Sequence, residues 1–221
     1  ICSVADEGVG SAPCIFWCDH NGISIQRIGG SVDYAVQEHR QVPYLNVAAI
    51  FDLTGWTRER AVQAKAGRTI SLCIPCRDEA NTIGGLVTLA KNALGGPNGL
   101  VDEIIVLDDR SIDGSADVAR GAGATVVPIS EVHEKHGEGR GKGNALWASL
   151  IVSKGDIVVW CDADVTSFEP DWVTRLVAPL LLDDHNAIVK AHYHRPTELG
   201  GGGRTTELVA RPLLSLFYPE L

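Results

Sequence analysis

The feature that most constrains the fold is a short apolar run, residues 157–161, followed by two carboxylates one residue apart, Asp162 and Asp164. Such a run is typical of a strand that is buried on both faces of a sheet. In open α/β sheets, ligands bind outside the carboxyl ends of the parallel strands. We therefore expect both carboxylates at the mouth of a site. Their Asp-x-Asp spacing allows them to approach one Mg²⁺ or Mn²⁺ ion that also contacts substrate phosphates.

Strands and helices are predicted to alternate along most of the chain. Further apolar runs predict strands over 69–75, 101–107, 124–129 and 187–193. Alternation at this pitch implies βαβ units and a mainly parallel sheet flanked by helices. We predict one α/β domain of the doubly wound, Rossmann-like type over residues 51–221. Residues 1–50 show no sustained period and are predicted to be a poorly defined segment, with disorder as one interpretation.

Three predicted helices carry an apolar stripe at helical spacing. The stripes are Ile83, Leu86, Val87, Ala90 and Leu94; then Leu146, Trp147, Leu150 and Ile151; and then Trp172, Val173, Leu176, Val177 and Leu180. Asp78 or Asn81 is available to cap the first of these helices. Residues 130–144, which are rich in glycine, histidine and charge, predict a loop, and a last helix is expected to start near Thr205.

Composition narrows the functional classes. The 221 residues carry a net charge of −9, which argues against a nucleic-acid partner, because that would need a basic patch. The charge is compatible with phosphorylated ligands, since a cation and a few local basic groups can reverse the sign at a site. No apolar run approaches the length of a membrane span, so we expect no membrane partner and a cytoplasmic location.

The six cysteines indicate free thiols rather than a disulfide framework. Buried thiols in a reducing compartment are the simplest account of them. In an extended segment Cys73 and Cys76 point to opposite faces, which argues against a redox pair. Cys14, Cys18 and His20 leave a zinc site open as an alternative, although a fourth ligand at a sensible spacing is lacking.

Acidic residues follow three of the predicted strands. The groups are Asp78 with Glu79, Asp108 with Asp109, and Asp162 with Asp164. Because the carboxyl ends of parallel strands meet at one edge of a sheet, we expect these groups to lie together. One of them can hold a metal, and the others can accept hydrogen bonds from a ribose or a base. Solvated loop acids are the alternative interpretation.

Two glycine-containing segments supply positive charge. In the first, residues 140–143, Lys142 stands between glycines that let the backbone approach a phosphate or a donor sugar, and a solvated basic turn is the alternative. In the second, glycines 200–203 precede Arg204 and two threonines at a predicted helix start. Free N–H groups, the helix dipole and a guanidinium would form an anion site there, with a flexible hinge as the alternative.

One strand end carries two histidines. His192 and His194 share a face of the predicted strand over 187–193, which leaves metal ligation open, although a polar strand end is the commoner case. No Ser/His/Asp or Cys/His set is evident, so covalent acyl chemistry has little support.

Together, these motifs resemble those of nucleotide-sugar glycosyltransferases with the GT-A fold. The resemblance lies in residues 74–79 (Ile-Pro-Cys-Arg-Asp-Glu), 106–111 (Val-Leu-Asp-Asp-Arg-Ser) and 162–164 (Asp-Ala-Asp). Two further segments, 141–147 and 202–213, narrow it to the glucosyl-3-phosphoglycerate synthases, a retaining family mainly of actinobacteria. Trp56 and residues 64–71 resemble the family's N-terminal lead-in, so the resemblance covers residues 55–221.

The resemblance implies transfer of glucose from UDP-glucose to 3-phospho-D-glycerate with retention, forming glucosyl-3-phosphoglycerate, with Mg²⁺ or Mn²⁺ as cofactor. It assigns the uracil and ribose of UDP-glucose to Pro75, Cys76, Arg77 and Glu79. Asp109 would lie over the uridine, Lys142 would contact the donor, Asp162 would touch ribose or sugar, and Asp164 would ligate the metal. The implied acceptor site, for the phosphate and carboxylate of 3-phosphoglycerate, is Gly203, Arg204 and Thr206.

By the same resemblance, the groups expected to carry catalysis are Asp162, Asp164, Lys142 and Arg204. Two positions depart from the family pattern, since Asp78 replaces the usual Asn and Asp109 stands where a small hydroxyl residue is common. The family also continues beyond residue 221 with a histidine metal ligand, further acceptor contacts and much of a dimer surface. We therefore expect a C-terminally truncated GT-A domain that binds donor weakly and turns over slowly or not at all, and a homodimer for the full-length protein.

Three other functions stay open on sequence alone. A GT-A transferase with another donor or acceptor, such as a mannosyl donor or a polyprenyl phosphate acceptor, would share the acidic strand ends. Nucleotidyl transfer uses a similar sheet and metal but usually needs a glycine-rich loop after the first strand, and residues 75–81 contain no glycine. The third is a non-catalytic fragment that binds a sugar nucleotide.

Overall fold

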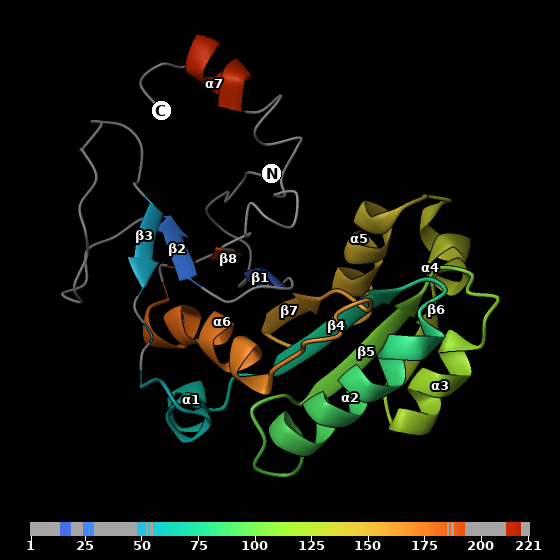
Figure 1. Ribbon diagram of the computed structural model, residues 1–221, viewed down its shortest axis with the longest axis horizontal. Helices are drawn as coiled ribbons and strands as arrows, with labels where there is room; N and C mark the ends of the chain where they lie inside the picture. Colours follow the sequence, from blue (N-terminus) through green and yellow to red (C-terminus); the bar gives the residue numbers. More distant parts are fainter. Residues whose placement is uncertain are drawn as a thin grey trace.

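The computed structural model describes residues 14–18, 24–28, 48–51, 53, 55–184, 186, 188–192 and 211–217. In these residues one eight-stranded sheet carries helices on both faces (Figure 1). The predicted α/β class, with a mainly parallel sheet flanked by helices, is confirmed.

The strand order is β3-β2-β8-β1-β7-β4-β5-β6. The strands in that order are Ala48–Phe51, Ser24–Ile28, Ile188–His192, Cys14–Cys18, Ile157–Cys161, Ile70–Cys76, Glu103–Asp108 and Thr125–Pro128. Neighbours from β8 to β6 run parallel, whereas β2 is antiparallel to both β3 and β8. The five strands predicted from apolar runs are all present, with ends shifted by up to two residues.

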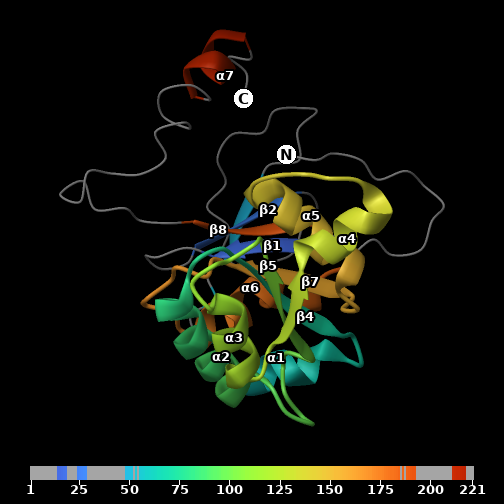
Figure 2. The same ribbon diagram turned by 90° about the vertical axis from the view of Figure 1, so that its right-hand side faces the viewer.

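Two apolar cores lie on opposite faces of the sheet. Figure 2 shows the helices that cover the two faces. The larger core packs α1 (Arg58–Lys65), α2 (Ala80–Leu94), α3 (Ser115–Ala122) and α6 (Pro170–Leu182) on one face. The smaller core packs α4 (Ile129–His136) and α5 (Lys142–Val152) on the other.

Strand β4 supplies side chains to both cores because successive residues of a strand point to opposite faces. Leu72, Ile74 and Cys76 belong to the larger core, and Cys73 belongs to the smaller one. Cys73, Cys76 and Cys161 are buried free thiols. The expectation that Cys73 and Cys76 face apart is therefore confirmed.

The apolar stripe predicted for α2 is confirmed, since all five of its residues are buried. The predicted cap is wrong. Neither Asp78 nor Asn81 caps the helix; instead Asp113, from the loop after β5, accepts the backbone N–H of Ala80 through Oδ2 at 2.9 Å. Asp78 adopts a left-handed backbone and accepts the N–H of Ile112 at 2.8 Å. The loops after β4 and β5 thus hold each other in place.

Two predictions between β6 and β7 are corrected. The segment predicted as a loop, 130–144, contains most of α4. Val132 and His133 follow Ile129 at the i+3 and i+4 positions, about one turn on, so the three side chains bury one side of a short helix. Helix α5 starts at Lys142, so Lys142 lies in its first turn.

The buried face of α5 also differs from the predicted stripe. Ala145, Ala148 and Ser149 face the sheet, while Trp147 and Ile151 are 40% and 42% exposed. Small side chains let the helix backbone approach the sheet closely, and Ser149 accepts a hydrogen bond from Trp160 Nε1 at 2.8 Å.

The stripe predicted for α6 is buried, together with most of the remaining helix surface. The helix lies between the sheet and α1, so both of its sides find apolar partners. A short helix α7, Arg211–Phe217, is described near the end of the chain. The helix expected from Thr205 and the glycines before it lie outside the described residues.

The first fifty residues contribute three described strands, β1, β2 and most of β3. The division of the chain at residue 50 stays a prediction. Among the described helices, none is long and apolar enough to cross a membrane.

The strand order reverses at β4, which is the topological switch point of the sheet. From β4 the chain adds β5 and then β6 on one side, and it then returns across the sheet through α4 and α5 to place β7 on the other side of β4. A crevice forms outside the carboxyl ends of the strands at such a switch point. The acidic strand ends lie there.

Candidate functional site

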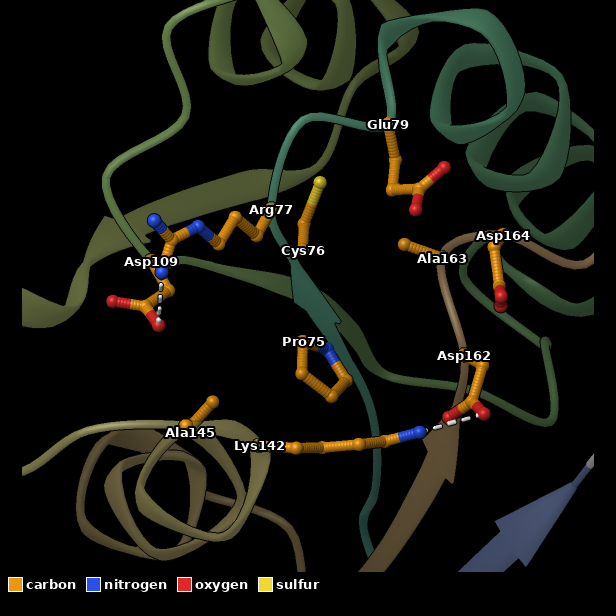
Figure 3. Close-up of a pocket in the computed structure, with 11 residues that line it drawn as sticks. Pro75, Cys76, Arg77, Glu79, Asp109, Lys142, Ala145, Asp162, Ala163 and Asp164 are labelled. Carbon is orange, nitrogen blue, oxygen red and sulfur yellow. Dashed lines mark ion pairs between the residues drawn. The ribbon is translucent and has the colours of Figure 1, made fainter.

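A cavity of about 280 Å³ lies at the carboxyl ends of β4, β5 and β7 (Figure 3). It is close to the lower end of the volumes typical of small-molecule sites. The lining residues are Pro75, Cys76, Arg77, Glu79, Asp109, Gly141, Lys142, Ala145, Asp162, Ala163 and Asp164. Four segments that are far apart in the sequence therefore meet in one place.

The cavity opens because β4 and β7 separate before β4 ends. Their pairing stops at Cys73 and Trp160, while β4 continues to pair with β5 as far as Cys76 and Asp108. Pro75 lies in the part of β4 beyond this point. It has no backbone N–H to give to a neighbouring strand, and its position is tolerated because the ladder with β7 has ended there.

Sharp turns after β4 and β5 direct one acid of each pair into the cavity. Asp78 and Arg110 have φ values of 55° and 62°, in the left-handed region that non-glycine residues rarely adopt. Glu79 and Asp109 line the cavity, and Asp78 instead bonds the neighbouring loop. Only one acid of each of the first two pairs thus reaches the cavity. In the third pair, both Asp162 and Asp164 line it.

Asp109 is held between two guanidinium groups. It is 8% exposed, with Arg77 Nη1 at 3.8 Å from Oδ2 and Arg110 Nε at 3.7 Å from Oδ1. Figure 3 shows Arg77 folded back over Asp109 on one side of the cavity. The carboxylate is thus charge-compensated, and the flat guanidinium of Arg77 is presented at the cavity wall.

Lys142 crosses the floor of the cavity from the first turn of α5. Its Nζ lies 2.7 Å from Asp162 Oδ2 (Figure 3). Gly141, with φ of 81°, precedes it and gives the chain the left-handed turn into the helix. The N-terminal turn of a helix carries partial positive charge, so this wall favours an anion.

Glu79 and Asp164 lie on the opposite side of the cavity from Asp109 (Figure 3). Burial, followed by the charge of Asp164, raises the pKa of Glu79 above its ordinary value. The lining as a whole has four carboxylates against two cationic side chains. This excess of negative charge would repel a diphosphate unless a cation accompanied it.

The donor set fits a metal that is shared with a ligand. Within the described residues, no three His, Cys, Asp or Glu side chains are grouped so as to hold a metal by themselves. Mg²⁺ is usually bound through one or two carboxylates plus substrate phosphates, rather than in a complete protein cage. Asp164, which is exposed at the cavity, and the nearby Asp162 suit that arrangement.

Cys76 lines the cavity with a buried free thiol. Burial, the largest cause, raises the pKa of its thiol to about 11. Without a metal the thiol therefore stays protonated at neutral pH, which disfavours it as a nucleophile.

The structure brings together all the described residues that the sequence nominated for donor and metal, namely Pro75, Cys76, Arg77, Glu79, Asp109, Lys142, Asp162 and Asp164. The nominated acceptor residues Gly203, Arg204 and Thr206 lie outside the described residues, as do His20 and His194. Ala145 and Ala163, which line the cavity with small side chains, were not predicted to belong to the site. Only their position beside charged residues could have indicated them.

Comparison with known proteins identifies the class. The family model described as glycosyl transferase family 2 matches residues 71–219. The match spans more than half of the chain and includes every described site residue above. The chain belongs to glycosyl transferase family 2.

Within that class, the chain is similar to glucosyl-3-phosphoglycerate synthases. It is 46% identical over 176 residues to the synthase of Mycolicibacterium paratuberculosis, covering 76% of this chain and 53% of the relative. It matches a structure of the Mycobacterium tuberculosis synthase in complex with Mn²⁺, UDP-glucose and phosphoglyceric acid, with a TM-score of 0.63 and 40% identity, covering 76% and 56% of the two chains.

A mannosyl-3-phosphoglycerate synthase from Rubrobacter xylanophilus is a third relative of known structure. It matches with a TM-score of 0.64 and 35% identity, over 77% of this chain and 55% of that one. These neighbours support the GT-A-like architecture that the sequence predicted. The chain spans about half the length of the curated relatives it matches.

Proposed function

We propose that the parent of this chain transfers glucose from UDP-glucose to 3-phosphoglycerate with retention, forming glucosyl-3-phosphoglycerate and releasing UDP. One observation carries the proposal. Eight residues assigned to donor and metal by family resemblance line a single cavity at the switch point of the sheet. The similarity to synthases of that name, at 42–46% identity for the mycobacterial relatives, supports the choice of substrates.

We assign the uridine to the side of the cavity formed by β4 and β5. Pro75 and Cys76 offer an apolar wall, and the Arg77 guanidinium, which is 64% exposed while paired with Asp109, offers a flat surface and hydrogen-bond donors. Glu79 supplies a carboxylate for ribose hydroxyls. A nucleoside needs this combination of apolar contact and a few directed polar groups.

We assign the diphosphate to the side formed by β7 and α5. Asp164, with Asp162 beside it, would hold Mg²⁺ or Mn²⁺, which would act as a Lewis acid on the diphosphate of the departing UDP. Lys142 and the N-terminal turn of α5 add positive charge on the facing wall. Asp162 keeps the Lys142 ammonium within the cavity.

We assign the acceptor to Gly203, Arg204 and Thr206. A guanidinium and backbone N–H groups would bind the phosphate and carboxylate of 3-phosphoglycerate, which leaves its free hydroxyl to meet the anomeric carbon. The glycosidic bond forms as the bond to UDP breaks, and the hydroxyl proton is released. Cys76 is not a candidate nucleophile, because its thiol is protonated. A homodimer and a cytoplasmic location stay predictions.

Calorimetric titration tests the donor assignment. UDP-glucose and GDP-mannose are titrated into the chain with and without Mn²⁺, and metal-dependent binding of UDP-glucose alone is the expected result. A preference for GDP-mannose would contradict the glucosyl assignment and favour the mannosyl alternative. Absence of binding in a folded sample would refute donor binding by this chain. A transfer assay with 3-phosphoglycerate, read by mass spectrometry and by the anomeric NMR coupling, then tests acceptor and retention.

The metal assignment predicts a specific loss. Asp164→Ala should lower the affinity for UDP in the presence of Mn²⁺ by more than about tenfold, because even groups that only orient a metal ligand usually change metal affinity by that factor. Asp117→Ala is the matched control. Asp117 lies on α3 away from the cavity, its side chain is 88% exposed, and it pairs with Arg120. Equal effects of the two substitutions would rule out the metal role of Asp164.

A further inference from the structure

Thr82 links helix α2 to the segment that carries the two β7 carboxylates. It lies in the first turn of α2 and does not line the cavity. Its Oγ1 donates to the carbonyl oxygen of Ala163 at 2.7 Å, across 81 positions of sequence. Ala163 is the residue between Asp162 and Asp164, and it is 4% exposed.

The hydroxyl has one proton to give and three acceptors within reach. The Glu79 carbonyl oxygen and Oε2 lie at 3.2 Å and 3.4 Å from Thr82 Oγ1, both farther than the Ala163 carbonyl. A distance of 2.7 Å is typical of a well-formed O–H···O bond, whereas 3.4 Å is long for one. The proton is therefore directed to Ala163, and the bond is a tertiary contact rather than the usual local bond of a helical threonine.

This contact fixes a part of the chain that the sheet no longer holds. β7 ends at Cys161, so residues 162–164 lie beyond the last strand residue. The carbonyl of Ala163 and the N–H of Asp164 belong to one planar peptide unit. The hydrogen bond to that carbonyl restrains the orientation of the plane, and through it the position from which the Asp164 side chain leaves the backbone.

We propose that Thr82 is a positioning residue, which acts through the Ala163 carbonyl to aim Asp164 and so determines how much a divalent cation strengthens UDP binding. The identity of the ligand rests on the function proposed above. The restraint itself concerns this chain alone and can be measured without any ligand.

The test compares two substitutions of one helix. Thr82→Val removes the hydroxyl and keeps the β-branched shape. Thr88→Val makes the same chemical change two turns on, where Oγ1 donates at 2.7 Å to the carbonyl of Gly84 within α2 itself. Thr82→Ser restores a hydroxyl at the first position and is the rescue variant.

The ligand-dependent measurement is the gain in UDP affinity on adding Mn²⁺, by calorimetry. We expect Thr82→Val to reduce this gain by about fivefold, the size expected for losing one hydrogen bond, and to leave metal-free UDP binding unchanged. Thr88→Val should show the same gain in UDP affinity as the original chain, and Thr82→Ser should recover most of that gain. An unchanged gain in Thr82→Val, or an equal loss in Thr88→Val, would overturn the proposal.

The ligand-free measurement is hydrogen exchange of the peptide that contains residues 162–166. Exchange there should be faster in Thr82→Val than in Thr88→Val, because a local opening has lost its restraint. Equal exchange in the two variants would overturn the restraint whatever the ligand result. If the original chain binds no UDP at all, the proposed function fails, and the exchange experiment still decides the role of Thr82.

Discussion

Lys142 is one of the residues that offset the negative charge of the cavity. It is one of two cationic side chains against four carboxylates, and its ammonium is 2.7 Å from Asp162. A bound diphosphate would compete with Asp162 for this ammonium. The pair therefore holds the lysine within the cavity before ligand arrives, and the side chain has only a short distance to move when it does.

Replacing that lysine should weaken UDP binding both with and without metal. We expect Lys142→Gln to lower the affinity by about tenfold, since charge-assisted hydrogen bonds contribute about 1.5–3 kcal/mol. Isothermal titration with UDP measures it. Lys154→Gln, at an exposed position after α5, is the control. If Lys142→Gln weakened binding no more than Lys154→Gln does, the diphosphate could not lie against Lys142.

Asp156 has a structural role at the amino ends of the strands, on the side of the sheet opposite the cavity. Its Oδ2 accepts the backbone N–H of Thr69 at 2.7 Å and the Thr69 hydroxyl at 2.8 Å, joining the starts of β7 and β4. These hydrogen bonds, with the backbone bond the largest cause, lower the pKa of Asp156. A lowered pKa means that the carboxylate stabilises the fold above its unfolded-state pKa, and that this contribution is lost as the pH falls through the folded-state value.

Asp156→Asn should therefore lower the melting temperature at pH 7, and the difference from the original chain should shrink as the pH falls through the acidic range of aspartate. Thermal unfolding followed by circular dichroism from pH 7 to pH 3 measures both effects. Asp171→Asn, which removes a surface pair with Arg175, should have little effect at either pH. A difference that is independent of pH would contradict the carboxylate's role.

Single residues were predictable where their chemistry is local. An acid directly after an apolar run is visible in the sequence, and Glu79, Asp109, Asp162 and Asp164 all line the cavity. The pairing of Thr82 with Ala163 was not predictable, because nothing in either neighbourhood indicates a partner 81 positions away. The expected acceptor residues stay a prediction.

Among the elements, α5 is the one whose orientation decides where Lys142 lies. Its sheet-facing side is made of Ala145, Ala148 and Ser149. Ala148 is fully buried in the smaller core, beside residues of β4, β5 and β7. There is no room for a larger side chain without moving the helix away from the sheet.

Enlarging that face should destabilise the fold. We expect Ala148→Leu to cost about 1–3 kcal/mol of the free energy of unfolding, the usual effect of overpacking a core. Ile151→Ala, on the exposed side of the same helix, should change it by less than about 0.5 kcal/mol. Urea unfolding of both variants measures the effect. A larger loss of stability in Ile151→Ala than in Ala148→Leu would mean that the apolar stripe, and not the small residues, faces the sheet.

The elements that sequence predicted well share one property. In α2 and α6 the core-facing residues are large and apolar, so periodicity detects them. Helix α5 turns small residues inward, which carry no hydrophobic signal, and α4 buries little more than Ile129, Val132 and His133. The cap of α2 comes from Asp113, which lies 33 positions from Ala80, so no local motif could reveal it.

For the whole molecule, ligand binding should appear as added stability. A ligand that binds only the folded state at about 100 times its Kd adds about 2.7 kcal/mol. For a chain of this length, that corresponds to a rise in melting temperature of roughly 5–11 °C. We expect UDP with Mn²⁺ to produce such a rise, measured by scanning calorimetry.

Removal of the metal is the control for this rise. Adding EDTA to the UDP complex should remove most of it, because the four carboxylates of the lining then face the diphosphate without a compensating cation. A rise that is unaffected by EDTA would place the diphosphate away from the carboxylates. Mn²⁺ alone should produce a much smaller rise than the pair, since no protein cage completes its coordination in the described residues.

The central place of β4 in the sheet also has a consequence during synthesis. Thr69, at the start of β4, and Asp156, at the start of β7, are 87 positions apart. A ribosome adding about 5–20 residues per second needs roughly 4–17 s to cover that interval. Throughout it, one edge of β4 shows unpaired backbone and apolar side chains, which invites aggregation. We therefore expect the nascent chain to be prone to aggregation in this interval, and the cavity is completed only when β7 closes that side of β4.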